Sequence, residues 1–274
     1  MTRLKFFFFI TFVSLYISGI SQFAFPAIGA ASNGMGGATV ALSDFWSGID
    51  NIAALSRCNT TTIGVSFSES FMLSQLSYKT LAFATPVSKV GVFTLKYTHF
   101  GSSAYSEQRI SGAYSQHIGN HIAIGAELDY LYCGTNDIYY DTYHRLTFSA
   151  GTQVYPTKDL TIGFHVFNPF GISLNKNYNQ SIPSVIRLGI AYHITSRMLT
   201  TIELEKNVYM RHNIKTGIEY KFSNYMFARL GFNTSPIIYS FGIGVKRYHW
   251  AIDISSQIHT QLGASPSISL SYSI

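Results

Sequence analysis

Acidic and basic residues occupy every second position in several apolar segments of this chain, a spacing that suits ion pairs inside a protein. Glu127 and Asp129, for example, alternate with Leu128 and Tyr130. Successive side chains of a strand point to opposite faces, so these charges share one face. The charges predicted to point inward are Glu127, Asp129, Arg145, Arg187, Glu203, Glu205, Lys215, Glu219, Lys221, Arg229 and Asp253.

Neighbouring segments carry opposite signs among these charges. Glu203 and Glu205 lie between a segment with Arg187 and one with Lys215 and Lys221. Opposite charges across neighbouring strands attract and would fill the interior with paired groups. Structural packing is the favoured role, and selectivity for a substrate is the alternative.

Metal, catalytic and nucleic-acid chemistry are not indicated. His117 and His121 are the closest pair among nine histidines, but they flank a predicted turn and no Cys or carboxylate accompanies them at metal-ligand spacing. There is no Gly-x-Ser-x-Gly elbow. The net charge of +6 is scattered rather than clustered, which argues against nucleic acid. We therefore expect that the protein is not an enzyme and that it binds no metal or cofactor.

The two cysteines are predicted to be free thiols. Cys58 precedes the first strand at one rim, whereas Cys133 falls at the far end of the fifth strand, next to a loop. A disulfide needs Cα atoms within about 7 Å of each other, far less than the thickness of a membrane.

Fourteen short segments of alternating polarity follow one another from Thr61 to Ile274. In residues 121–132, apolar side chains at even positions alternate with small or acidic ones at odd positions. A soluble sandwich would bury the apolar face, whereas a barrel in lipid turns it outward and keeps charges in the lumen. The segments have about 10 residues, which suits tilted strands that cross a membrane.

The connections between the segments favour the membrane barrel. Odd connections are predicted to be longer, including residues 134–143, 168–183, 233–238 and 259–266, and the even ones are tight. Transmembrane barrels have short periplasmic turns and longer outer loops. Aromatic residues predicted at the strand ends suit a membrane interface: Tyr139, Tyr140, Tyr143, Phe167, Phe170 and Tyr178.

The sequence therefore predicts an all-β protein, a transmembrane antiparallel β-barrel of about 14 strands. We expect it to lie in the cell outer membrane, in contact with lipid, and to have both termini in the periplasm. Residues 1–21 are predicted to be a signal peptide, with Arg3 and Lys5 before an apolar core and a small-x-small site at Gly19 to Ser21. The last strand alternates up to Ile274 and resembles the signal that the outer-membrane assembly machinery recognises.

Residues 27–57 do not alternate and are rich in glycine. The run from Gly29 to Asp44, GAASNGMGGATVALSD, is followed by Asn51-Ile52-Ala53-Ala54-Leu55. This pattern resembles the hatch motif of the long-chain fatty-acid transporter-like (FadL-like) outer-membrane barrels, including the PorV/PorQ-type proteins of Bacteroidota. The residues that match are Gly34, Met35, Gly36, Gly37, Asp44, Asn51 and Ala53, whereas Ile52 and Ala54 replace the usual Pro and Gly.

The resemblance implies that residues 22–58 form a hatch folded inside a barrel of residues 59–274. Inward glycines recur about once per strand, at Gly125, Gly151, Gly163, Gly189, Gly217 and Gly231. They would leave room for a plug or ligand, or ease curvature of the wall.

Two functions from different classes fit this resemblance. In the first, the protein is a component of protein export or surface assembly, as in type IX secretion, and Tyr139, Tyr140, Tyr143 and Tyr178 contact a protein partner. The first is the main prediction; the alternative is a FadL-like uptake channel with an apolar pocket at the hatch, from which a small hydrophobic ligand leaves through a gap in the wall.

Overall fold

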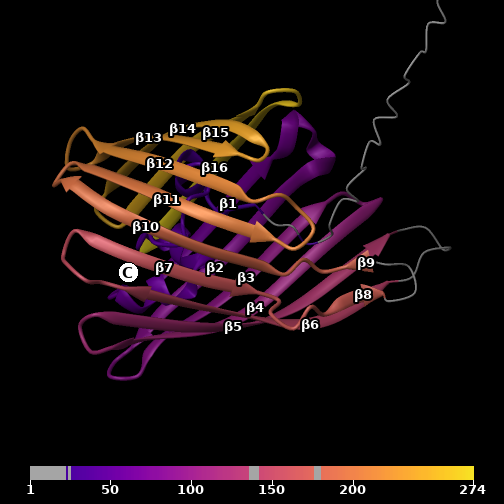
Figure 1. Ribbon diagram of the computed structural model, residues 1–274, viewed down its shortest axis with the longest axis horizontal. Helices are drawn as coiled ribbons and strands as arrows, with labels where there is room; N and C mark the ends of the chain where they lie inside the picture. Colours follow the sequence, from indigo (N-terminus) through magenta and orange to yellow (C-terminus); the bar gives the residue numbers. More distant parts are fainter. Residues whose placement is uncertain (1–22, 24–25, 136–141, 176–179) are drawn as a thin grey trace, which may run out of the picture.

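The computed structural model is a closed antiparallel barrel of fourteen strands, as the sequence predicts (Figure 1). The structure describes residue 23 and residues 26–135, 142–175 and 180–274, so the predicted signal peptide lies outside it. Strand β1 pairs with β16 and closes the barrel. The wall strands are β1 Thr62–Glu69, β2 Ser77–Val87, β3 Gly91–Gly101, β4 Tyr105–Ile118, β5 Ile122–Thr135, β6 Tyr143–Val154, β7 Leu160–Phe167, β10 Val185–Thr195, β11 Met198–Asn207, β12 Asn213–Lys221, β13 Met226–Thr234, β14 Ile237–Arg247, β15 Trp250–His259 and β16 Gly263–Ser273.

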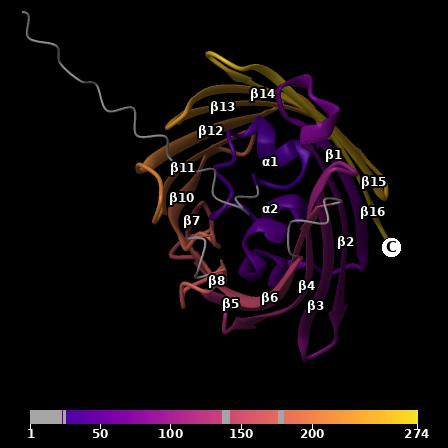
Figure 2. The same ribbon diagram turned by 90° about the vertical axis from the view of Figure 1, so that its right-hand side faces the viewer.

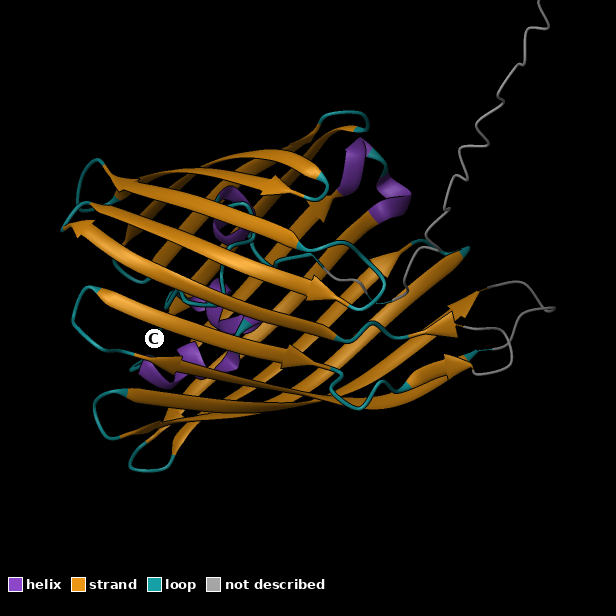
Figure 3. Ribbon diagram, viewed as in Figure 1, coloured by secondary structure: helices purple, strands orange, loops and turns teal. Residues whose placement is uncertain are grey.

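The remaining elements are short. Strands β8 Ser173–Asn175 and β9 Gln180–Ser181 pair in a separate two-stranded sheet in the connection between β7 and β10. The helical elements are α1 Ala30–Gly34, α2 Phe45–Asp50, η1 Ile52–Arg57, η2 Ser70–Met72 and η3 Ser74–Leu76. Among the described residues, none of these helices is long and apolar enough to cross a membrane (Figure 3).

The alternation predicted from the sequence is confirmed in the burial of the strands. In β5, Ile124, Leu128 and Tyr130 are exposed on the outer wall, whereas Glu127 and Asp129 are buried in the lumen. The outer surfaces of the other strands carry large apolar side chains in the same way. An apolar outer wall around a polar interior is typical of barrels that face lipid.

The connections alternate in length less than predicted. Residues 70–76 and 168–184 form long connections at one end of the barrel, but only residues 235–236 and 260–262 separate the later strand pairs at that end. The prediction of loops over residues 233–238 and 259–266 is therefore wrong, because both segments continue the ladders of β13 to β16. We call this end the loop end, and the opposite end, which carries Ile274, the turn end.

The N-terminal residues 26–58 lie inside the barrel, and we call them the plug (Figure 2). Helix α1 contacts β13 to β16, while η1 contacts β3 to β6 on the opposite side of the lumen. The plug thus crosses the lumen from wall to wall. The boundary between plug and barrel at residue 58 stays a prediction, and β1 begins at Thr62.

Candidate functional site

Inward glycines of the wall provide the close approach that the plug backbone needs. A Cβ atom on Gly125 would lie 2.7 Å from the Ala53 nitrogen, and one on Gly217 would lie 2.7 Å from the Met35 oxygen. At Gly163 and Gly231, a Cβ atom would overlap backbone atoms of Val40 and Gly36. Of the two roles left open for these glycines, the geometry supports room for the plug.

The hatch-motif residues build the plug itself. Asp44 caps α2 by accepting hydrogen bonds from the Trp46 and Ser47 nitrogens, at 3.0 and 3.1 Å. Asn51 donates from Nδ2 to the Val40 oxygen at 2.6 Å. Ala53 is buried against Gly125.

The glycines of the motif turn the chain after α1. Gly34 ends α1, and Met35 follows it as the C-cap residue. Gly36 and Gly37 have φ of +68° and +70°, in the left-handed region that favours glycine. These motif residues set the path of the plug backbone and expose no reactive group.

Eight of the predicted inward charges take part in three groups of ion pairs in the lumen. On the β11 to β15 side, Lys215 pairs with Glu205 at 2.6 Å and with Glu203 at 3.6 Å. Arg229 pairs with Glu219 at 2.7 Å and with Asp253 at 2.5 Å. On the β3 to β5 side, Glu127 and Asp129 share two cations that the sequence analysis missed.

Those two cations are Lys96 and Arg109. Lys96 lies 3.0 Å from Glu127, and the Arg109 Nε atom lies 2.7 Å from Asp129. The signal that could have found them is the alternation already used, because Lys96 falls between outward Leu95 and Tyr97. Buried charges are tolerated when they are paired and hydrogen-bonded, which is the case here.

Several wall side chains bind the plug directly. Glu203, fully buried on β11, accepts hydrogen bonds from the Thr39 and Val40 nitrogens, both at 2.8 Å. Gln153 donates to the Val40 and Leu42 oxygens at 3.0 and 2.8 Å. Two of the predicted inward charges, Glu203 and Arg187, therefore hold the plug in place, since Arg187 donates to the Asp50 oxygen at 2.7 Å.

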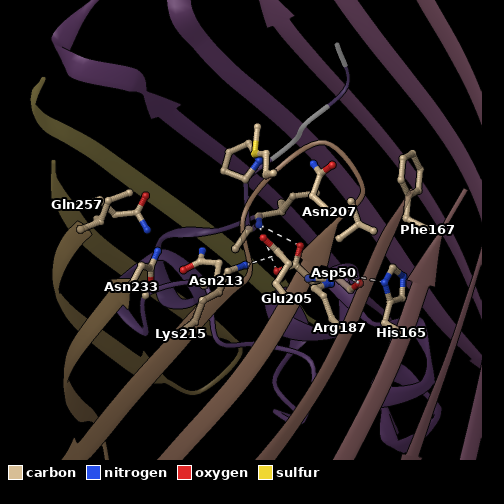
Figure 4. Close-up of a pocket in the computed structure, with 18 of the residues that line it drawn as sticks. Asp50, His165, Phe167, Arg187, Glu205, Asn207, Asn213, Lys215, Asn233 and Gln257 are labelled. Carbon is tan, nitrogen blue, oxygen red and sulfur yellow. Dashed lines mark hydrogen bonds and ion pairs between the residues drawn. The ribbon is translucent and has the colours of Figure 1, made fainter. Parts of the chain in front are cut away.

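A cavity of about 280 Å³ lies between the plug and the wall (Figure 4). Its lining includes Val185, Asn207 and Asn213, which lie at the loop ends of their strands, so the cavity opens on the loop-end side of the plug. One part of the lining is apolar, with Phe23, Ile28, Ile49, Phe167, Val185, Met210 and Pro236. Another is polar, with Asp50, Arg187, Glu205, Asn207, Asn213, Lys215 and Asn233.

The charges around the cavity come from the plug, from Arg187 and from the ion-paired groups of Lys96 and Lys215. Burial raises the pKa of Asp50 to about 6, against the opposing effect of the nearby Arg187 guanidinium. Arg187 also contacts the His165 Nδ1 atom at 3.1 Å. Such a lining fits a ligand that has an apolar body and a polar group.

Phe23, the one described residue before the plug, lines one side of this cavity. The Phe23 nitrogen donates to Glu107 at 2.8 Å, and the Tyr105 hydroxyl donates to the same carboxylate at 2.6 Å. The Phe23 ring is buried with Phe167, Leu131, Cys133, Leu174 and Ile182. Phe167 was predicted to lie at a membrane interface, which is wrong, because the inward side of β7 carries it into this cluster.

The other predicted loop residues have mixed outcomes. Tyr139, Tyr140 and Tyr178 lie outside the described residues. Tyr143 begins β6 and packs, partly buried, against the Phe23 cluster. Cys58 and Cys133 carry free thiols, as predicted, and Cys133 lies near the loop end of β5, where it is buried and its thiol donates to the Tyr105 oxygen at 3.5 Å.

The histidines of the β4–β5 turn do not gather metal ligands. His121 lies 2.9 Å from the Tyr155 oxygen, and the His117 ring packs 5.7 Å from the Tyr155 ring. Within the described part of the chain, no three His, Cys, Asp or Glu side chains come together as a metal site.

Solved structures with the same fold include outer-membrane channels. No protein-family model and no curated protein matches this sequence. The structure called CymD monoaromatic hydrocarbon channel is 12% identical, with a TM-score of 0.70, over 90% of this chain and 98% of that one. The toluene transporter TodX of Pseudomonas putida is 12% identical, with a TM-score of 0.68, over 92% and 99% of the two chains.

A FadL homologue of Pseudomonas aeruginosa gives a similar result. It is 12% identical with a TM-score of 0.65, over 90% of this chain and 98% of that one. At such low identity these similarities show the fold alone, which is that of FadL-type outer-membrane barrels. None of them supports the PorV/PorQ-type assignment.

Proposed function

We propose that this protein is an outer-membrane channel for the uptake of small molecules that have an apolar body and a polar group. The observation that carries the proposal is the cavity of about 280 Å³ on the loop-end side of the plug. Ligand pockets typically have volumes of about 300–1,000 Å³, so this one suits a small ligand such as a single substituted ring.

The fold supports the same function. The structural neighbours described as a hydrocarbon channel and a toluene transporter cover nearly the whole chain. The apolar outer wall supports a location in the outer membrane. The mixed lining of the cavity favours a ligand that is more polar than a pure hydrocarbon, because Asn207, Asn213 and Arg187 offer hydrogen bonds to it.

Passage beyond the cavity requires movement of the plug. At the turn end, Arg57 of the plug stacks over the Tyr155 ring at 3.4 Å. The wall beside the plug is continuous, since β2, β3 and β4 pair in unbroken register. The prediction named no strands for its gap in the wall, and this continuity argues against an exit at β2 to β4. We infer that ligand passes when contacts such as those of Glu203 and Arg187 release part of the plug.

The role in protein export, which was the main prediction from the sequence, has less support than the uptake channel. It rested on the hatch-motif resemblance and on loop tyrosines, and three of those tyrosines lie outside the described residues. Export in type IX secretion therefore stays a prediction. Purification from the native outer membrane, with a search for a stoichiometric protein partner, tests it.

A pair of neighbouring substitutions tests the uptake function. Val185 lines the cavity, whereas the next residue, Ile186, is 48% exposed on the outer wall. In proteoliposomes, we expect the Val185→Trp variant to lose uptake of benzyl alcohol and the Ile186→Trp variant to keep it. The wild-type protein failing to exceed empty vesicles, or both variants behaving alike, would refute the proposal.

A further inference from the structure

The turn end of the barrel carries a rim of basic side chains. Lys89 lies in the β2–β3 turn, Lys158 in the β6–β7 turn and Arg197 in the β10–β11 turn. Arg247 ends β14 on its outward face. We call these four residues the turn-end rim. All four are exposed, and the turns themselves contain a single acidic residue, Asp159.

These cations are available for a partner. Among the described residues, no ion pair joins any of the four to a carboxylate of this chain, whereas Lys96, Arg109, Lys215 and Arg229 in the lumen are all paired. They lie around the edge of the barrel, on turns that Figure 1 shows at the left. A ring of positive charge that has no carboxylate partner and lies outside the lumen attracts anions at the same depth in the membrane.

Exposed aromatic side chains mark the depth at which this end of the barrel lies in the membrane. Tyr192, Tyr220, Phe222, Tyr225, Tyr248 and Trp250 are exposed at the same end of strands β10 to β15 or in their turns. Tyr220 and Phe222 pack edge to face at 4.9 Å, and Trp250 packs on Tyr272 at 4.5 Å. Aromatic belts of this kind mark the boundary between hydrocarbon and head groups.

The cations therefore lie beside or just beyond the aromatic belt. Tyr248, which is 82% exposed, directly follows Arg247, and the guanidinium lies 5.3 Å from its ring. This places the positive charges at the depth of lipid phosphate groups, since long basic side chains extend from the interface towards the head groups.

We propose that the turn-end rim binds the phosphate groups of anionic phospholipids in the leaflet that it faces. Short turns mark the periplasmic end of transmembrane barrels, so this leaflet is the phospholipid leaflet of an outer membrane. The lipid contact anchors the barrel at a fixed depth and stands apart from ligand passage through the lumen.

Native mass spectrometry of the full-length protein in mild detergent tests the proposal. The probes are phosphatidylglycerol and phosphatidylcholine with identical acyl chains, added in separate titrations. Each basic residue near an anionic surface contributes about five-fold to affinity. We expect phosphatidylglycerol to be retained at a concentration at least about ten-fold lower than phosphatidylcholine, with the preference weakened by added salt.

A matched pair of triple variants locates the site. The turn-end variant Lys89→Gln/Arg197→Gln/Arg247→Gln should lose the preference for phosphatidylglycerol. The loop-end variant Lys79→Gln/Lys206→Gln/Arg211→Gln removes the same charge and should keep it. These residues lie outside the lumen and its ion pairs, so both variants should fold, which the heat-modified mobility of the barrel on gels confirms.

Three results would overturn the proposal. The wild-type protein could bind the two lipids equally. The two triple variants could lose the preference equally, which would make the effect one of net charge alone. Finally, the turn-end variant could keep its lipids and instead lose an acidic protein that copurifies with the wild type, which would make the rim a protein-docking surface.

Discussion

Replacing Glu203 by alanine should release the plug while leaving the barrel intact. The buried Glu203 carboxylate accepts hydrogen bonds from the Thr39 and Val40 nitrogens at 2.8 Å each. A buried donor that loses its partner costs about 1–3 kcal/mol, so two such donors cost roughly 3 kcal/mol in total. Because the strand ladders on both sides of β11 remain, the loss falls on the plug rather than on the wall.

Hydrogen exchange in detergent measures this loss directly. A destabilisation of about 3 kcal/mol corresponds to a roughly hundred-fold faster exchange of amides that open with the plug. We expect that acceleration in peptides from residues 26–58, with strand peptides unchanged.

The matched control is Glu205→Ala. Glu205 lies two residues further along β11 and also pairs with Lys215, at 2.6 Å, but among the described residues it accepts no hydrogen bond from the plug backbone. It should leave plug exchange near the wild-type rate. If Glu203→Ala accelerated amide exchange equally in plug and strand peptides, or changed it in neither, the reasoning would be refuted.

Three further predictions concern the plug and the ion pairs. Gly163→Val should expel part of the plug and raise ion conductance in planar bilayers, because a Cβ atom there would lie 2.8 Å from the Ala41 Cα, whereas Gly112→Val on the outer wall should not. The pKa of Asp50 is about 6 in the folded protein against 3.8 unfolded, so the fold favours its protonated form. Plug stability, followed by hydrogen exchange, should therefore be highest below pH about 4, fall as the pH rises to about 6 and stay level above it, and Asp50→Asn should remove this dependence. Lys96→Met leaves Glu127 without one of its two cations and should lower the free energy of barrel unfolding by about 3 kcal/mol, which a lower unfolding temperature would show. Substitution of the exposed Lys79 by Met should have little effect.

The wall of the barrel was predictable because its pattern is local. Strand β5 shows this: Ile124 and Leu128 face outward and Glu127 and Asp129 inward, as a period of two requires. The same rule places Phe167 in the lumen, where it was not predicted, because its position near a strand end suggested an interface. The prediction of a loop over residues 233–238 was wrong, because the strands there pair almost to the turn.

The site was predictable only in part, because it depends on contacts between distant residues. Glu203 was predicted to face the lumen, but its partner Thr39 lies 164 positions away. Asp50 gave no signal, because it lies in a segment without strand or helix periodicity. The glycines of the wall suggested room for a plug, and the contact of Gly125 with Ala53 required the three-dimensional arrangement.

The most direct test of the central claim is a crystal structure of the protein with 4-bromobenzyl alcohol, using the anomalous signal of bromine to locate the ligand. The account predicts a bromine peak inside the lumen near Phe167 and Ile49, with the hydroxyl towards Arg187 or Asn213. Bromine peaks confined to the outer wall, with the cavity filled by water, would contradict it.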